Sequence, residues 1–430
     1  MDEFGFVDGL FEVLFLSSLV DRVSRSVREY DAQGWHRTGT RVDDDSAEWL
    51  VGRVAELGQS THVESFELER VVPRESYVEV DGRRIDGFPL FDGTFTDEVG
   101  VSGTLGLGGS ECDIAVIEFQ AAGGAADIQS LRESGRYKAF VGIVTSGLGE
   151  VSGAAPSPQI AHTLTSLHSG QSGRDDSVPE GLAIRNGEFF SSRGGAPVVQ
   201  VSSVEYERVI AAAESGAEVR VVAQAEVEST TAQNVIVEVA GSDSSLAPLV
   251  VMTPRSGWFS CAVERGGGVA CWLEIMSWFS ENPPVRDVIF IATSGHELGH
   301  VGLKSFLNSN SELRENAHAW LHLGASIGAA LDWMPRLQTS DVEFERVALD
   351  SFSADPGFAD LVPLTIVPTG TTKSGEAMQI NRFGGRFVSV IGNHALFHQE
   401  SDQWPDAVDA EALAIYASAL TRIAGRLSGV

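Results

Sequence analysis

The second half of the chain alternates two patterns of hydrophobic and polar positions. Short, continuous apolar runs are typical of buried strands, and apolar residues spaced three or four apart are typical of helices. Strand, helix, strand and helix are predicted in turn at residues 247–254, 266–279, 286–295 and 317–329, and a final helix at 409–427. Buried strands that alternate with helices indicate a largely parallel sheet covered on both faces. In such sheets the functional site lies beyond the carboxyl ends of the strands.

The first block, residues 1–95, is predicted to form helices and a strand. Residues 46–58 fit a helix with Ser46 as N-cap and Gly58 at its end. The apolar run near the start resembles a signal peptide, but its head is acidic and no small-residue cleavage site follows it. An amphipathic helix is therefore expected there.

The middle block, residues 96–235, is rich in Gly, Ser and Val and contains short strand-like runs. Strands are expected at 139–147, 196–202 and 217–228, a helix at 205–216 and an exposed loop at 168–181. We therefore predict an α/β protein with two domains. Residues 1–95 and 236–430 form a discontinuous three-layer α/β/α sandwich with a mixed, mainly parallel sheet, and residues 96–235 form a smaller β-rich inserted domain.

Composition narrows the range of functions. Sixty acidic residues against 30 basic ones give a net charge of −30, which opposes binding to nucleic acid or to anionic membranes. Three cysteines form no disulfide framework, so reduced thiols and a cytoplasmic location are expected. No apolar stretch reaches the length of a membrane span. The expected partner is a small-molecule or peptide substrate, and the oligomeric state stays open.

The pentapeptide HELGH, His296 to His300, fits the H-E-x-x-H pattern of helical zinc sites. That site needs both histidines on one face of an established helix. Here a buried strand, residues 287–293, runs straight into Ser294 and Gly295, and Gly299 separates the histidines. We therefore expect His296 and Glu297 to stand at the carboxyl end of a strand, and His296 and His300 not to bind one metal together.

The wider context of this motif resembles the zinc aminopeptidase family, which includes bacterial aminopeptidases, glutamate carboxypeptidase II and glutaminyl cyclase. The resemblance lies in "LVVMTPRSGW", "ERGGGVACWLEIM" and "VIFIATSGHELGHVG", within residues 248–302. It extends to residues 36–58 and to "FHQESDQWPDAVDAEALA" at 397–414. The β-rich middle block is similar to the protease-associated domain that is often inserted in this family.

The resemblance implies a reduced metal site. The family has five ligands for two metals, an aspartate that accompanies the first ligand, and a glutamate base; the corresponding positions here are Pro254, Ser256, Glu264, His296, Glu297, Gly324 and His398. Both ligands exclusive to one metal are replaced, by Pro254 or Ser256 and by Gly324. The ligands of the other metal remain as Glu264, Glu297 and His398. The resemblance therefore implies one divalent metal, zinc before manganese or iron, with His296 in place of the base.

Further residues near this site have open roles. His394, His300 and His322 are candidates for additional metal ligands or for partners of the ligands, and His394 also fits a surface position. His322 is placed on a strand two residues before Gly324, so it points to the same face. Arg255 and Arg265 are expected at the rim of the site, where they either bind an anionic group of the substrate or neutralise the acids.

Two further features have simple interpretations. Asp402 stands where the family keeps an aspartate. Cys261 and Cys271 flank the triple glycine of residues 266–268 and are expected to be packing residues.

Three functions remain after these observations. The first is a metal-dependent, aminopeptidase-like hydrolase of amide or peptide bonds with a single metal and an altered base. The second is a different reaction on the same scaffold. The third is a catalytically silent relative that binds a ligand or a partner.

Overall fold

A computed structural model describes residues 3–90, 93–119, 131–132, 134–144, 164–167, 181–184, 195–201, 205–398 and 401–430. The larger lobe contains a mixed sheet with the strand order β9-β11-β10-β12-β15-β13-β14. Neighbours β11, β10, β12 and β15 run parallel, as do β13 and β14, while β9 and β13 are antiparallel to β11 and β15. Their bounds are β9 Glu218–Val239, β10 Leu249–Pro254, β11 Val288–Thr293, β12 Ala319–Leu323, β13 Met334–Thr339, β14 Thr365–Val367 and β15 Phe387–Asn393.

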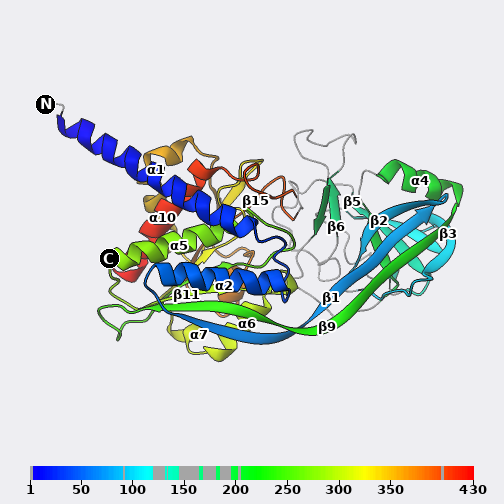
Figure 1. Cartoon of the computed structure of the whole chain (residues 1–430), viewed down its shortest axis with the longest axis horizontal. Helices are drawn as coiled ribbons and strands as arrows, with labels where there is room; N and C mark the ends of the chain where they lie inside the picture. Colours follow the sequence, from blue (N-terminus) through cyan, green and yellow to red (C-terminus); the bar gives the residue numbers. More distant parts are fainter. Residues whose placement is uncertain are drawn as a thin grey trace.

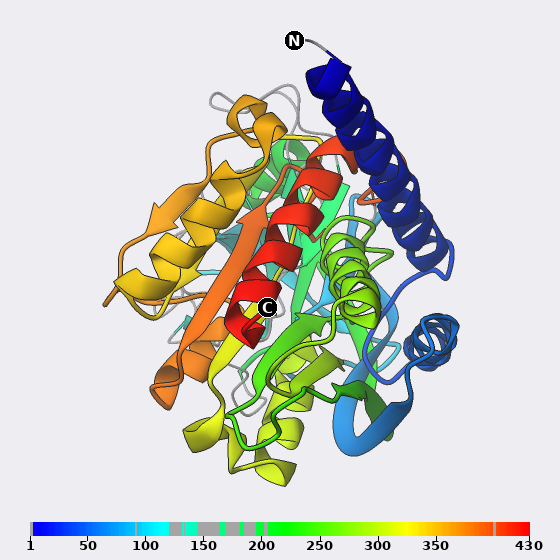
Figure 2. The same cartoon turned by 90° about the vertical axis from the view of Figure 1, so that its left-hand side faces the viewer.

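Helices cover both faces of this sheet. In β10, Leu249 and Val251 pack in the core beneath α5 and α10, while Val250 and Met252 pack on the opposite face. Figure 2 shows α10 and α5 crossing one face of the sheet. The helices are α1 Glu3–Asp31, α2 Arg41–Glu56, α5 Gly266–Glu281, α6 Val301–Ser309, α7 Leu313–Asn316, α8 Val342–Ser353, α9 Ala377–Arg382 and α10 Ala410–Ser428, with short 3₁₀ turns η4 His296–Leu298 and η5 Pro356–Asp360. The predicted α/β class with a mixed sheet is confirmed.

The helix predicted at residues 317–329 is wrong. Residues Ala319–Leu323 form strand β12 instead.

A long two-stranded ribbon connects the two lobes (Figure 1). Strand β1, Thr61–Val80, pairs with β9 along nearly its whole length, with a shift of register between Pro73 and Ser76. Hydrogen bonding therefore continues from the larger lobe into the second one, and the described strands form one 13-stranded sheet together with a separate pair, β6 and β7. The second lobe contains α4 Tyr206–Ser215 and the strands β2 Arg83–Pro89, β3 Val101–Leu107, β4 Ile114–Phe119, β5 Ala139–Val144, β6 Leu164–Leu167, β7 Gly181–Ile184 and β8 Val198–Val201.

The second lobe has a hydrophobic core of its own. Val78 and Ile85 pack there with Val116 and Val199. Val78 and Ile85 belong to the block 1–95, which the sequence analysis assigned to the larger domain. The chain therefore enters the second lobe within β1, before residue 95, and the division into two folding units otherwise stays a prediction. The predicted loop at 168–181 lies outside the described residues except for Gly181, which begins β7.

Helix α2 begins earlier than the sequence predicted. Thr40 is its N-cap and accepts a hydrogen bond from the backbone N–H of Asp43, whereas Ser46 is buried inside the helix. The side chain of Asp43 in turn accepts from the N–H of Gly39 at 2.8 Å, which closes the turn before the helix. Among the described residues, no helix is both long and apolar enough to cross a membrane.

The triple glycine at the start of α5 lets this helix approach the sheet closely. A Cβ at Gly267 would clash with the carbonyl oxygen of Ile327, and one at Gly268 would lie 2.7 Å from Oγ1 of Thr253. We expect Gly267→Ala to lower the free energy of unfolding by about 1–3 kcal/mol, the usual cost of overpacking. Gly52→Ala in α2 is the matched control: nothing lies within 4 Å of its Cβ, so it should raise stability by about 0.5–1 kcal/mol. Urea denaturation of both variants measures the change in the free energy of unfolding. If Gly267→Ala is as stable as Gly52→Ala, the backbone around Gly267 accommodates the added methyl group and the prediction is wrong.

Candidate functional site

Four chain segments meet beyond the carboxyl ends of the parallel strands. Arg255 and Ser256 follow β10, His296 and Glu297 follow β11, Glu264 and Arg265 precede α5, and His394, His398 and Asp402 follow β15. The side chains named here are all buried. This is the position that a parallel sheet predicts for a functional site.

The HELGH motif is not a helical zinc site. His296, Glu297 and Leu298 form the 3₁₀ turn η4, which starts after Gly295 and ends at Gly299, both in left-handed conformation. His300 also has a left-handed backbone, with φ of 60°, and α6 begins only at Val301. The expectation that His296 and Glu297 stand in the loop after the strand is confirmed.

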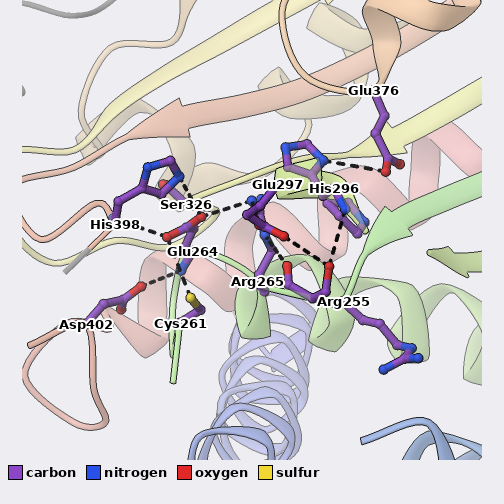
Figure 3. A network of polar contacts seen from close by, with 12 residues as sticks. Arg255, Cys261, Glu264, Arg265, His296, Glu297, Ser326, Glu376, His398 and Asp402 are labelled. Carbon is purple, nitrogen blue, oxygen red and sulfur yellow. Dashed lines mark hydrogen bonds and ion pairs between the residues drawn. The ribbon is translucent and has the colours of Figure 1, made fainter. Parts of the chain in front are cut away.

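Arg265 joins the two carboxylates that the sequence proposed as metal ligands. Its Nη2 atom lies 2.9 Å from Oε1 of Glu264 and 2.7 Å from Oε1 of Glu297, and its Nε donates to the carbonyl oxygen of Ser256 at 2.9 Å. The Arg265 side chain is fully buried (0% exposed), and Figure 3 shows it between the two acids. Burial alone would lower the pKa of this guanidinium, but Glu264 and Glu297 raise it above its usual value. Arg265 therefore carries a permanent positive charge at the centre of the site and does not lie at its rim.

The carboxylate of Glu264 has three further contacts besides Arg265, two of them with His398. Nε2 of His398 lies 3.2 Å from Oε1 of Glu264, and the backbone N–H of His398 donates to Oε2 at 3.2 Å. The thiol of Cys261 donates to the same Oε2 at 3.7 Å. Burial opposes ionisation of Glu264, but His398 and Arg265 outweigh it and hold its pKa well below the usual range.

Glu297 is held from its other side by Ser256. The Ser256 hydroxyl donates to Oε2 of Glu297 at 3.1 Å and accepts from the N–H of Gly295 at 2.9 Å. Burial raises the pKa of Glu297 to about 7, although Arg265 acts in the opposite direction. Ser256 therefore fixes the loop after β11.

His296 faces away from the acid pair, toward α9. Its Nδ1 lies 3.5 Å from Oε1 of Glu376, a buried residue that also accepts a hydrogen bond from Thr293 at 2.8 Å. The neighbouring ring of His300 is 4.7 Å away between centroids, and Nδ1 of His300 is hydrogen-bonded to Gln379 at 3.1 Å. Glu376 and Gln379 lie in no motif, so nothing in the sequence indicated them.

Two more of the proposed residues lie near the site with partners of their own. Arg255 is buried and binds Asp43 at 2.7 Å and the carbonyl oxygen of Gln233 at 2.6 Å. Arg255 therefore links the end of β10 to α2 and β9. It does not lie at the rim of the site, where the sequence placed it. Nδ1 of His322 is hydrogen-bonded to Ser389 at 2.8 Å, and its ring lies 2.9 Å from where a Cβ of Gly324 would stand. The ring of His322 thus lies directly beside Gly324.

A second group of ligand-type side chains lies on the Cys261 side of Glu264. One potential ligand atom from each of Cys261, Glu264 and Asp402 lies within 4.8 Å of the others, and all three residues are buried. Asp402 accepts hydrogen bonds from the N–H groups of Val263 and Glu264, both at 3.0 Å. Burial raises the pKa of Asp402 to about 8, and burial together with Glu264 and Asp402 raises that of Cys261. Cys261 is thus more than the packing residue that the sequence suggested.

Comparison with solved structures identifies the architecture. A zinc aminopeptidase from Bacillus subtilis aligns over 94% of this chain and 94% of its own, with a TM-score of 0.68 at 17% sequence identity. The chain has the zinc aminopeptidase fold. An aminopeptidase from an Aneurinibacillus species gives a TM-score of 0.64 at 15% identity over 94% of this chain and 93% of its own. A peptidase precursor from Shewanella amazonensis gives 0.67 at 15% identity over 97% and 96%.

The sequence comparisons add no closer relative. No family model matches this chain, and no curated protein matches it either. The zinc aminopeptidase fold is therefore established by tertiary structure alone, and the activity has to be argued from the site.

Proposed function

We propose that this chain is a non-hydrolytic protein with the zinc aminopeptidase fold, and that it binds a peptide ligand without cleaving it. The observation that carries the proposal is the position of Arg265. Its Nη2 atom is within hydrogen-bond distance of both Glu264 and Glu297, at 2.9 and 2.7 Å. A fixed guanidinium there supplies the positive charge that a metal ion would otherwise bring to these acids.

The residues around Arg265 fit a metal by their chemistry but not by their arrangement. Two carboxylates and an imidazole, from Glu264, Glu297 and His398, are a suitable donor set for zinc. The atom that lies between the two carboxylates, however, is a nitrogen of a fully buried cation. An ion bound by the same oxygens would meet that cation at close range in a site of low dielectric, where repulsion between like charges is strong. Arg265 would have to leave before this set could hold a metal.

The remaining parts of a hydrolytic centre are also altered. Pro254 and Gly324 offer no ligand atom, and Ser256 is engaged with Glu297 and with the backbone of Gly295. His296, the candidate base, is directed to Glu376 at 3.5 Å. A base acts on a water that is activated and positioned beside it, and here the activating ion is replaced by Arg265. These changes act together to favour the silent function among the three that the sequence left open.

A peptide is the ligand that this scaffold supports. The solved structures with the same fold are named as aminopeptidases, and the altered centre stands at the same carboxyl edge of the sheet where α/β proteins bind ligands. A protein that keeps this fold but does not hydrolyse peptide bonds can still bind a peptide, and we propose this binding as its function.

The test combines an activity assay with a binding assay. The full chain, stripped with a chelator and then supplied with zinc, manganese or iron, is incubated with aminoacyl amides and a mixed peptide library. We expect no cleavage above the buffer blank, and peptides retained on the protein should be recovered at their full mass. Turnover that requires an added metal and disappears in Glu297→Ala would overturn the proposal, and so would the absence of any retained peptide.

A further inference from the structure

Two segments that are far apart in sequence bring four ligand-type side chains together beside the Arg265 centre. Cys261 and Glu264 belong to the turn before α5, while His394 and Asp402 belong to the segment after β15. All four are buried, and ligand atoms of Cys261, Glu264 and Asp402 lie within 4.8 Å of one another. Acids alone would not define a site, but this group combines a thiol, two carboxylates and an imidazole.

His394 is the independent observation that points to a ligand. Its Nδ1 is hydrogen-bonded to the hydroxyl of Ser326 at 2.9 Å, which fixes the orientation of the ring. Its Nε2 is directed at Asp402 and lies 3.7 Å from Oδ2. That nitrogen is buried and makes no hydrogen bond to any of the described residues. A metal-ligating histidine is oriented by a hydrogen bond at its other ring nitrogen, and the bond from Ser326 to Nδ1 here leaves Nε2 directed toward Asp402.

We propose that Cys261, Glu264, Asp402 and His394 bind one zinc ion, which clamps the segment 394–402 to the turn before α5. Thiolate, carboxylate and imidazole are all zinc ligands, and a soft sulfur beside hard oxygens favours zinc over magnesium or calcium. Four protein ligands complete a tetrahedron without an open position, so this ion is structural and not catalytic.

The separations between the ligand atoms suit such an ion. Ligand atoms about 2.0–2.3 Å from a tetrahedral zinc lie roughly 3.3–3.6 Å from one another. Sγ of Cys261 is 3.7 Å from Oε2 of Glu264, and Nε2 of His394 is 3.7 Å from Oδ2 of Asp402. Both separations lie just above that range.

The clamp shares Glu264 with the centre that Arg265 occupies but uses the other oxygen of its carboxylate. Oε1 of Glu264 contacts Arg265, whereas Oε2 contacts Cys261. The clamp includes neither Glu297 nor His398. Zinc in the clamp therefore leaves the Arg265 pair in place, and the two sites are distinguished by variants that touch only one of them.

The experiment uses cobalt as a spectroscopic probe for zinc. The full chain is stripped with a chelator and titrated with Co²⁺, and then with Zn²⁺. We expect one equivalent to bind, with the sulfur-to-cobalt charge-transfer band of a thiolate ligand in the near ultraviolet, and zinc should displace the cobalt and raise the thermal midpoint. Cys261→Ser and His394→Ala should weaken binding at least tenfold, and the first should also abolish the band.

Controls separate this proposal from the proposed function. Cys271→Ser removes another buried thiol, and Glu297→Ala alters the Arg265 centre; both should keep the band. Circular dichroism confirms that each variant is folded, and His394→Ala, which keeps every thiol, tests the site if Cys261→Ser does not fold. No binding, or binding without a thiolate band, would overturn the clamp and leave the proposed function standing. Binding that is lost in Glu297→Ala but retained in Cys261→Ser would place the ion at the Arg265 centre and overturn both proposals.

Discussion

Replacing Arg265 with alanine is expected to lower the free energy of unfolding of the metal-stripped protein by about 3–5 kcal/mol, the usual cost of removing one partner of a buried ion pair. Glu264 and Glu297 both face Arg265, at 2.9 and 2.7 Å, and neither is exposed to water that could solvate its charge. Without the guanidinium, two carboxylates remain buried side by side. Urea denaturation at neutral pH measures the loss.

The same variant should gain a metal. Removal of Arg265 leaves Glu264, Glu297 and His398 around an open space, and these are the three ligands that the sequence proposed for zinc. Metal analysis after reconstitution should find one more zinc per chain in Arg265→Ala than in the wild type, and zinc should restore much of the lost stability because it binds only the folded state.

Two comparisons make the Arg265 test specific. In the double variant Arg265→Ala with Glu297→Ala the extra zinc should disappear. Arg53→Ala is the matched control for loss of an arginine, because Arg53 pairs with Glu29 at a partly exposed position and should cost less than about 1 kcal/mol. If Arg265→Ala is as stable as the wild type and binds no additional metal, Arg265 does not stand in for an ion.

Replacing Arg255 with methionine is expected to cost a similar amount, about 3–5 kcal/mol. Arg255 and Asp43 form an ion pair at 2.7 Å with side chains 1% and 0% exposed. Asp43 also accepts hydrogen bonds from the N–H of Gly39 and the hydroxyl of Ser294, so its charge is fixed in place when the arginine is removed. Thermal or urea unfolding of the full chain measures the effect.

The double variant Arg255→Met with Asp43→Asn tests the cause. Neutralising the stranded carboxylate should recover part of the loss, so the double variant should be less destabilised than the sum of the two single ones. Arg74→Met is the surface control, because its pair with Glu226 has side chains 51% and 63% exposed and should be worth less than about 1 kcal/mol. Strict additivity would mean that Arg255 and Asp43 contribute independently and that the ion pair is not what holds β10 to α2.

The strands and helices of the larger lobe could be predicted because their hydrophobic patterns are strong and local. Buried strands such as β10 and β11 are continuous apolar runs, and α10 carries an apolar face at helical spacing. The segment containing β12 was the exception, because its run of five buried residues in "AWLHL" is short enough to fit either structure. Packing between β10 and β15 decides in favour of the strand.

The motif at His296 to His300 could be interpreted from its neighbours in sequence. A buried strand followed by glycine requires a turn, so the pentapeptide could not lie on one established helix. The same argument placed Glu297 beyond the end of β11, where it lies next to residues that follow β10. The alternation of buried strands with helices indicates parallel strands, and the carboxyl ends of parallel strands lie at one edge of the sheet.

The amino-acid sequence was sufficient to predict the class of fold and the segments that meet at the site. It was not sufficient to predict which side chains contact one another, because those contacts depend on how the segments pack. Arg265 was expected to reach outward from a rim, but a guanidinium beside two buried carboxylates is stabilised far more by pairing with them than by water at a distance. His296 turns to Glu376, about 80 positions further along the chain, and Asp402 lies near Cys261, about 140 positions before it. Such pairings depend on the packing of side chains in three dimensions, which no local pattern of hydrophobic and polar residues encodes.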